Sequence, residues 1–286
     1  LALYCAAGGI APHRVLPVTL DVGTNNPDLL NSERYMGIPE NRISGPEYFD
    51  MVDEFMQAVF ARWPNVIVQF EDFETPKAVP LLERYRYKYR MFNDDIQGTG
   101  SVTLSGMLSA LRNAGESITD CKVLCVGAGS AGLGVCEQIV DGMVEAGLDR
   151  EEAMKRFVVT TSTGALGAHD GKHDDPNVKR GKISSLTKPW INDTVSDGTR
   201  VADIITQFKP NVLLGLSTVK DTFDEEIIRN MAAVHDRPII MPMSNPTDKA
   251  ECTPKQAYEW TDGRAVVATG SPFDPVEYKG KTYIPR

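Results

Sequence analysis

The sequence predicts an α/β fold: a Rossmann-like doubly wound parallel sheet, preceded by part of a second α/β active-site domain. From Gln97 onward, segments typical of strands and helices alternate, as in parallel sheets with right-handed crossovers. A glycine-rich turn, Gly127–Gly132, joins one of these strands to a helix. Two acidic pairs, Glu71-Asp72 and Asp94-Asp95, come shortly before that turn. We place the domain boundary at the second pair, which divides the chain into residues 1–93 and 94–286.

The first domain is predicted to hold two short buried strands on either side of a helix. Val18–Val22 and Val66–Phe70 are apolar runs of strand length. Between them apolar side chains recur at helical spacing, at Phe49, Val52, Phe55, Met56, Val59 and Phe60. Glu71 and Asp72 then follow the end of a strand, where open α/β sheets place their sites. Ala78–Tyr89 is predicted to be a helix with a basic, solvated face.

The second domain is predicted to alternate helices and strands to its end. Helices are expected at Ser101–Asn113, Ala131–Ala146, Val201–Phe208 and Phe223–Ala232, and from Thr253-Pro254 onward, where Thr253 is a capping residue. Strands are expected at Lys122–Val126, Phe157–Thr160, Asn211–Leu216, Pro238–Met243 and Arg264–Ala268. The polar segment Gly164–Asp197 is predicted to be a long surface connection, and Leu166, Trp190 and Trp260 are assigned to packing.

Composition limits the class of protein. The 286 residues are enough for about two domains of ~150 residues. A net charge of −9 without long basic runs argues against binding to nucleic acid or to an anionic membrane. No apolar run approaches the ~20 residues of a membrane-spanning helix.

The cysteines and histidines form no metal or disulfide pattern. There are five cysteines and four histidines without paired spacing. Cys121 and Cys125 fall on a predicted buried strand, where thiols act as small core side chains. A reducing intracellular compartment, cytoplasm or mitochondrial matrix, is therefore expected.

The segment from Gly127 to Gly132 fits the G-x-G-x-x-G pattern of a dinucleotide-binding turn. Gly127 permits the tight turn, Gly129 lets a pyrophosphate approach, and Gly132 allows the helix to pack closely on the strand. Ser130 and Ala131 open the helix, whose N–H groups favour phosphate. A plain glycine turn is the alternative, and the strand–turn–helix context favours the cofactor site.

The cofactor is predicted from the end of the next strand. NAD sites usually carry a carboxylate there, whereas this chain has Thr161 and Ser162. Hydroxyls suit a 2′-phosphate, and the following loop offers cations at Lys172, Lys179 and Arg180. NADP is therefore preferred over NAD, unless the acid lies elsewhere or the backbone reads the ribose. The loop that contains Ser217 is expected to pass beside the cofactor ribose.

The two acidic pairs are a candidate site for Mg²⁺ or Mn²⁺. Carboxylate oxygens are the ligands that these hard cations prefer. Acidic pairs are most often solvated surface, but these are flanked by apolar side chains, at Phe70, Phe73, Phe92 and Ile96. Buried carboxylates without a partner are costly, so a divalent ion is the favoured interpretation.

Several segments together resemble the malic enzymes. FEDF at Phe70–Phe73 and FNDDIQGT at Phe92–Thr99 enclose the acidic pairs. LPVTLDVGTNN at Leu16–Asn26, SNPT at Ser244–Thr247 and ATGSPF at Ala268–Phe273 complete the match in the family's order. The resemblance implies metal-dependent oxidative decarboxylation of L-malate to pyruvate and CO₂ with reduction of NAD(P). It also implies a homo-dimer or homo-tetramer.

The resemblance also implies roles for individual residues. Glu71, Asp72 and Asp95 would ligate the metal, and Asp94 would orient a catalytic lysine. Asn245 would bind the substrate carboxylate near the nicotinamide, although an Asn-Pro pair that only ends a strand is the alternative. The chain departs from the family at Thr161, where relatives commonly carry Asp, and at Phe73-Glu74-Thr75-Pro76, where they often carry small residues and an asparagine.

The resemblance implies that further catalytic residues fall outside this chain. The general-base lysine would come just before Leu1, with a general-acid tyrosine and a substrate-binding arginine further upstream. A segment with a pair of asparagines would follow Arg286. The chain is therefore expected to be a fragment that binds dinucleotide without turning over malate. Two alternatives stay open: another two-domain nicotinamide dehydrogenase, which metal dependence would distinguish, or a non-catalytic dinucleotide-binding module.

Overall fold

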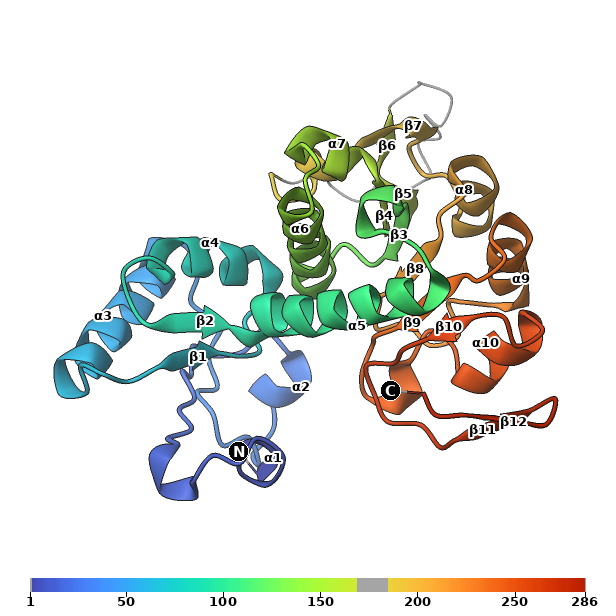
Figure 1. Ribbon diagram of the computed structural model, residues 1–286. Helices are drawn as coiled ribbons and strands as arrows, with labels where there is room; N and C mark the ends of the chain where they lie inside the picture. Colours follow the sequence, from blue (N-terminus) through green and yellow to red (C-terminus); the bar gives the residue numbers. More distant parts are fainter. Residues whose placement is uncertain (1, 169–184, 286) are drawn as a thin grey trace. The chain divides into compact units, whose positions relative to one another are not determined.

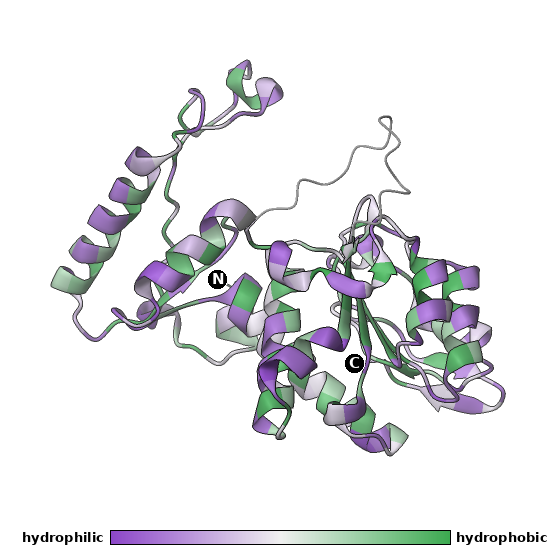
Figure 2. Cartoon of the chain, turned by 90° about the horizontal axis from the view of Figure 1, so that it is seen from above, coloured by the Kyte–Doolittle hydropathy of each residue, from purple (hydrophilic) through white to green (hydrophobic). Residues whose placement is uncertain are grey.

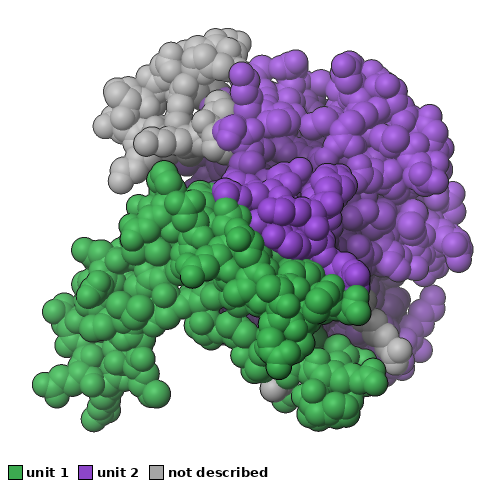
Figure 3. All heavy atoms as spheres, turned by 90° about the vertical axis from the view of Figure 1, so that its left-hand side faces the viewer, with its two compact units in different colours: residues 1–66 green, residues 67–286 purple. Residues whose placement is uncertain are grey.

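The computed structural model describes residues 2–168 and 185–285, and the chain divides into two compact units. Residues 1–66 make the first unit and residues 67–286 the second (Figure 3). This division precedes the domain boundary predicted at residues 93 and 94, which stays a prediction.

The first unit consists of helices joined by irregular segments. Helix α1 covers Ala2–Ala6, α2 covers Pro27–Leu30, and a 3₁₀ turn lies at Pro12–Arg14. The long helix α3, Pro46–Arg62, confirms the predicted amphipathic helix and buries Tyr48, Val52 and Met56 on one face.

The strand predicted at Val18–Val22 is wrong, since residues 15–26 form no regular secondary structure. Their backbone pairs with an irregular loop: Thr24 N donates to Glu40 O at 2.8 Å, and Ile43 N donates to Val22 O at 3.0 Å. Val18 is 53% exposed. A short apolar run becomes a strand only when a second strand completes its ladder.

The second unit is built on a six-stranded sheet in the order β10-β9-β8-β3-β4-β5 (Figure 1). The strands are β3 (Val123–Val126), β4 (Phe157–Thr161), β5 (Gly164–Ala165), β8 (Val212–Gly215), β9 (Ile239–Pro242) and β10 (Val266–Val267). All pairings are parallel except β4 with β5. The predicted doubly wound parallel sheet is confirmed.

Helices cover both faces of this sheet, which explains why its strands are apolar throughout. Every residue of β3, β8 and β9 is buried, as expected for a parallel sheet between two layers of helices. Figure 2 shows these strands as continuous green segments, whereas the helices mix green and purple. The helices are α5 (Thr99–Ala114), α6 (Ser130–Glu145), α7 (Arg150–Lys155), α8 (Val201–Phe208), α9 (Glu225–Val234) and α10 (Pro254–Trp260).

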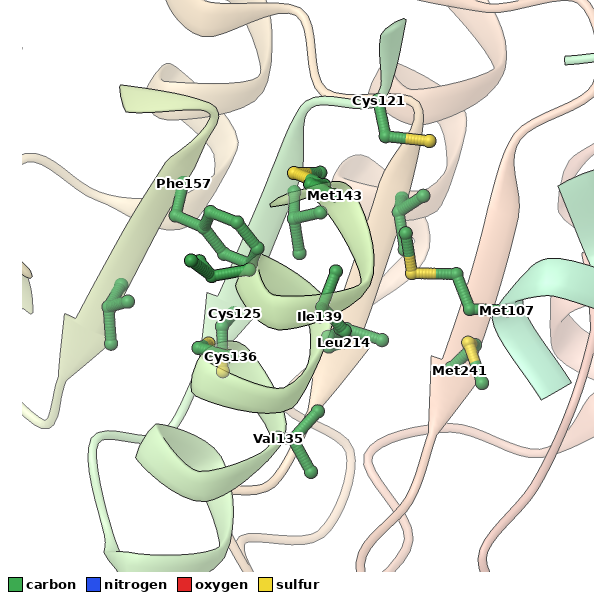
Figure 4. Close-up of a cluster of buried hydrophobic side chains, with 14 of the residues drawn as sticks. Met107, Cys121, Cys125, Val135, Cys136, Ile139, Met143, Phe157, Leu214 and Met241 are labelled. Carbon is green, nitrogen blue, oxygen red and sulfur yellow. The ribbon is translucent and has the colours of Figure 1, made fainter. Parts of the chain in front are cut away.

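Alternate residues of the central strand face two separate cores. Val123 and Cys125 pack in the cluster that contains buried side chains of α5, α6 and α7. Leu124 and Val126 pack in the cluster that contains those of α8, α9 and α10. Figure 4 shows the first cluster, with Cys125 beside Cys136. The prediction that Cys121 and Cys125 are core side chains is confirmed, since both are buried and unpaired by disulfides.

The surface connection predicted at Gly164–Asp197 is wrong in part. Residues 169–184 lie outside the described residues, but β6 (Gly167–Ala168) pairs with β7 (Asn192–Ser196). Leu166 and Trp190 are buried, and the Trp190 ring meets the Phe157 ring edge-on at 5.6 Å. Because the segment is polar on average, its composition did not indicate these two buried side chains, which belong to residues that contact β4.

A second, smaller parallel sheet carries the acidic segments. It pairs β1 (Val68–Phe70) with β2 (Met91–Asn93), and α4 (Thr75–Tyr85) connects the two. A hairpin of β11 (Val276–Tyr278) and β12 (Lys281–Tyr283) comes near the end of the chain. Among the described residues, no helix has the length and apolar character needed to span a membrane.

Candidate functional site

The register of the small sheet brings the two acidic pairs together. Phe70 of β1 is paired with Asn93 of β2 in parallel, so the next residues along each strand lie opposite one another. This register sets Glu71 beside Asp94, and Asp72 beside Asp95. The backbone N–H of Asp72 donates to Asp95 Oδ2 at 2.9 Å. Residues separated by more than twenty positions therefore share one end of a sheet.

Three of these acids form a group with the geometry of a metal site. Glu71, Asp72 and Asp95 each offer a carboxylate oxygen, and these oxygens lie within 4.8 Å of one another. Glu71 and Asp72 are exposed, and Asp95 is half-buried. The oxygen-only donor set suits Mg²⁺ or Mn²⁺, which keep further positions for water or substrate. The residues present fit such an ion, and their role as ligands stays a prediction.

The electrostatics of the cluster also favour a cation. Burial raises the pKa of Asp95, and the nearby carboxylates of Glu71, Asp72 and Asp94 raise it further, although the Asp72 N–H opposes this shift. The pKa of Asp94 is raised by burial and by Glu71. Like charges gathered in one place disfavour ionisation, and a divalent cation would relieve that repulsion.

Asp94 and Asp95 lie in a π-helix, Asp94–Gly98, which sequence reasoning did not anticipate. Fully buried Asn93 caps it by accepting from Ile96 N at 3.0 Å, and Gln97 Oε1 accepts from Asn93 N at 3.1 Å. Single π-turns often occur at functional sites. The side-chain amides of Asn93 and Gln97 were missed because they bind backbone N–H groups beside the acids and do not touch the carboxylates themselves.

The glycine turn has the backbone geometry that its pattern predicts. Gly127 has a φ of 122°, and a Cβ there would collide with Leu216. A Cβ on Gly132 would collide with the carbonyl oxygen of Gly127, so α6 can start this close to β3 only with glycine. A Cβ on Gly129 would meet nothing within 4 Å. The first and third glycines close the turn, and the second leaves the open side by which a pyrophosphate could approach.

The π-helix and the glycine turn belong to one packed assembly. A Cβ on Gly134 of α6 would lie 2.8 Å from Ile96 Cγ2, so the turn that carries Asp94 and Asp95 packs on α6. Gly134 is about one helical turn beyond Ser130, where α6 begins. One member of the acidic group, Asp95, therefore lies in a turn that packs on the helix that begins at the glycine turn.

The other predicted cofactor residues follow neighbouring strands of the large sheet. β3 lies between β4 and β8, which makes it the point where the strand order reverses and where open sheets bind ligands. Thr161 ends β4, and Ser217 follows β8. Asn245 follows β9. Parallel strands bring these residues to the same edge as Gly127, and their cofactor roles stay predictions.

The hydroxyl of Thr161 takes part in local hydrogen bonds. Its Oγ1 lies 2.9 Å from Thr163 Oγ1 and accepts from Thr163 N at 3.2 Å. Ser162 is the exposed residue between them. Lys172, Lys179 and Arg180, suggested as partners of a 2′-phosphate, lie outside the described residues.

The structure identifies one buried acid that sequence reasoning missed. Glu251 is 0% exposed and accepts hydrogen bonds from Ser217 and Ser244. Its only signal in the sequence is a charged residue between Ala250 and Cys252, just before the α10 cap.

Comparison with known proteins shows the family. The family model described as malic enzyme, NAD binding domain matches residues 96–286, and the one described as malic enzyme, N-terminal domain matches residues 1–86. The NAD-dependent malic enzyme of Photorhabdus laumondii is 49% identical over 284 residues, and that of Erwinia tasmaniensis is 48% identical over 283. Each alignment covers 99% of this chain and 50% of the relative. The chain thus spans about half the length of the curated relatives it matches.

Solved structures agree. The crystal structure of Entamoeba histolytica malic enzyme matches with a TM-score of 0.59 and 29% identity, over 77% of this chain and 41% of that one. The NAD-dependent malic enzyme of Thermotoga maritima matches with a TM-score of 0.62, over 82% of this chain and 55% of that one. Its identity of 22% supports the fold alone. Taken with the two family models, which match most of the sequence, these likenesses establish that the chain belongs to the malic enzyme family.

Proposed function

We propose that the complete protein containing this chain oxidatively decarboxylates L-malate to pyruvate and CO₂, with NAD as hydride acceptor and Mg²⁺ or Mn²⁺ as metal cofactor. One observation carries the proposal: three carboxylates gather at the end of the small sheet, and the turn that holds one of them, Asp95, packs on the helix that begins at the glycine turn. The names of the relatives support the same activity.

The acidic group and the glycine turn have separate tasks in this proposal. Glu71, Asp72 and Asp95 hold the ion, while the turn from Gly127 to Gly132 and the start of α6 hold the pyrophosphate. When bound, the ion would supply Lewis acidity toward the substrate, and the nicotinamide would supply the hydride acceptor. Asn245 binds a substrate carboxylate, and Asp94, beside Glu71, orients the base.

NAD is the proposed cofactor because the relatives are named NAD-dependent. This choice differs from the NADP preference that the hydroxyls of Thr161 and Ser162 indicated. Both cofactors contain the pyrophosphate that the glycine turn is suited to hold. They differ only at the adenosine ribose, which carries a 2′-hydroxyl in NAD and a 2′-phosphate in NADP.

The test is an assay of the purified complete protein with L-malate, NAD and Mn²⁺. We expect NADH to form, measured by absorbance, with one pyruvate released for each NADH. Chelation of the metal should stop both products. NADH formation that is unaffected by chelation, or that yields no pyruvate, would exclude this function and favour a different nicotinamide dehydrogenase.

A further inference from the structure

The buried carboxyl group of Glu251 lies between the loops that follow β8 and β9. Its Oε1 accepts from Ser217 N at 2.9 Å, from Ser217 Oγ at 3.0 Å and from Ser244 Oγ at 2.5 Å. Its Oε2 accepts from Ser244 N at 3.3 Å. One side chain therefore ties together two loops that come from neighbouring strands.

Ser244 extends this connection. Its hydroxyl donates to Glu251 and accepts from Thr218 N at 2.9 Å. The loop after β8 is thus held at two successive residues, and the loop after β9 is held at the residue immediately before Asn245. These bonds fix the hydroxyl of Ser217 and the backbone position from which Asn245 extends.

The fold reserves space for this carboxyl group. A Cβ on Gly215, the last residue of β8, would lie 2.5 Å from Glu251 Cδ. A glycine is needed there because any larger residue would displace the acid. The glycine and the acid are 36 positions apart in the chain, so local pattern could not link them.

Stability alone does not account for a buried acid at this position. A carboxyl group removed from water is costly unless hydrogen bonds compensate it, and a well-packed apolar side chain often serves stability as well. What the acid provides, and an apolar side chain would not, is a fixed geometry for four donors on two loops.

We propose that Glu251 is a positioning residue, which holds Ser217 against the cofactor ribose and Asn245 against substrate and nicotinamide. This inference rests on the proposed function for the substrate, whereas its effect on the cofactor is measurable by NAD binding alone.

The experiment uses the complete protein and three variants. Glu251→Gln keeps the volume but replaces one oxygen with an NH₂ group, which then faces a backbone N–H. Glu251→Ala removes all four acceptor contacts, and Ser244→Ala removes only the link from Glu251 to Thr218. We measure the dissociation constant for NAD by fluorescence titration, the KM for malate, kcat and Tm.

We expect NAD binding to weaken about tenfold in Glu251→Gln and Ser244→Ala, and further in Glu251→Ala, because each removes hydrogen bonds that hold the two loops in place. The KM for malate should rise in the same order. If Glu251→Ala fails to fold, Ser244→Ala still tests the proposal.

Two controls separate positioning from general destabilisation. Thr261 is fully buried and its hydroxyl donates to Ala257 O at 2.7 Å, so Thr261→Ala should lower Tm without changing NAD affinity. Glu259→Gln removes an exposed acid from the same segment, and should change neither.

The inference is overturned if the Glu251 and Ser244 variants bind NAD as tightly as Thr261→Ala at equal loss of Tm. If the wild-type protein binds NAD but does not turn over malate, the proposed function is excluded instead. The NAD affinities of the variants would still decide the role of Glu251.

Discussion

The acidic group and the glycine turn both follow parallel strands, yet they are built in opposite ways. The acidic group stands at the end of two strands of three residues each, and two of its three members are exposed. The glycine turn follows a strand with every residue buried, at the centre of a six-stranded sheet. One site gathers side chains of like charge, and the other is shaped by backbone contacts that exclude side chains.

The difference indicates how far the shape and stability of each site depend on its bound ligand. The glycine turn is held by the packing of Gly127 and Gly132, so it should keep its shape without cofactor. The acidic group carries repulsion that a bound cation or protonation relieves. The two sites should therefore respond separately to mutation, metal and pH.

The largest expected effect is the loss of turnover in Asp95→Ala. Removing a proposed carboxylate ligand would leave the ion under-coordinated, and Lewis-acid catalysis is worth several kcal/mol. In the complete protein we expect Mn²⁺-dependent malate turnover to fall by at least about 10³-fold. Absorbance of NADH measures the turnover, and fluorescence titration measures NAD binding.

The comparison of the two sites requires that NAD affinity in Asp95→Ala stays close to that of the wild type. An equal loss of NAD affinity would mean that the two sites are one cooperative unit. Full activity of this variant would show that Asp95 is not a metal ligand.

Gly132→Ala should produce the complementary result. Its new Cβ would collide with the Gly127 carbonyl oxygen, which forces α6 away from β3. We expect NAD affinity to fall about 100-fold, since the phosphates lose aligned N–H donors. Binding of Mn²⁺, followed by isothermal titration calorimetry, should weaken much less, because Glu71 and Asp72 follow β1 and do not lie on the turn that packs on α6.

Two glycine controls sharpen this result. A Cβ on Gly106 of α5 would make only ordinary contact with Met241 at 3.6 Å, so Gly106→Ala should keep both affinities. Gly129→Ala should keep the fold, because its Cβ meets nothing within 4 Å. Its methyl group should nevertheless obstruct the open side of the turn and weaken NAD binding. Unchanged NAD binding in Gly129→Ala would contradict the assigned direction of approach.

The sequence predicted those features that depend on local pattern. Helix α8 was predicted with its observed bounds, Val201–Phe208, because apolar residues mark one face between a polar loop and a strand. The glycine turn was equally predictable, since Gly127 and Gly132 have no room for a side chain and Gly129 keeps one side of the turn open. Helix α7 was missed, although Asp149 caps it and acids fill its first turn, because it is only six residues long.

Features that depend on distant pairing could not be predicted. The acidic pairs were recognised as candidates, but only the register of β1 with β2 explains how they meet. Glu251 bonds to Ser217 from 34 positions away, and no spacing rule links them. The failed strand at Val18–Val22 shows the same limit, because an apolar run contains no information about its partner.

A smaller effect is expected at the ribose, where Thr161→Asp should favour NAD. A carboxylate at the end of β4 accepts from the ribose 2′-hydroxyl and repels a 2′-phosphate. We expect the ratio of kcat/KM for NAD to that for NADP to rise about tenfold. Thr161→Val is the matched control, because it removes the hydroxyl without adding charge. A ratio that Thr161→Asp leaves unchanged would show that cofactor choice is made elsewhere.

The smallest effect concerns the stability of the metal-free acidic group, which Asp95→Asn should increase. Burial and the neighbouring carboxylates raise the pKa of Asp95 above its ordinary value of 3.8. A carboxyl whose pKa is raised by folding is most favourable when protonated. Its contribution to stability is therefore fully present below about pH 4 and is lost as the pH rises through the raised pKa. At neutral pH the ionised group opposes folding.

An asparagine at this position keeps an oxygen for the Asp72 N–H and carries no charge. With metal chelated at pH 7, we expect Asp95→Asn to raise Tm by about 2 °C, because partly exposed charges interact weakly. The difference should vanish below pH 4, where wild-type Asp95 is itself neutral. Asp193→Asn, at an exposed position on β7, is the matched control. Adding Mn²⁺ should reverse the order, since an ion that binds only the folded wild-type site stabilises it by mass action. If Asp95→Asn lowers Tm in chelator, the hydrogen bonds of the carboxylate outweigh its repulsion, and the acidic group is as preformed as the glycine turn.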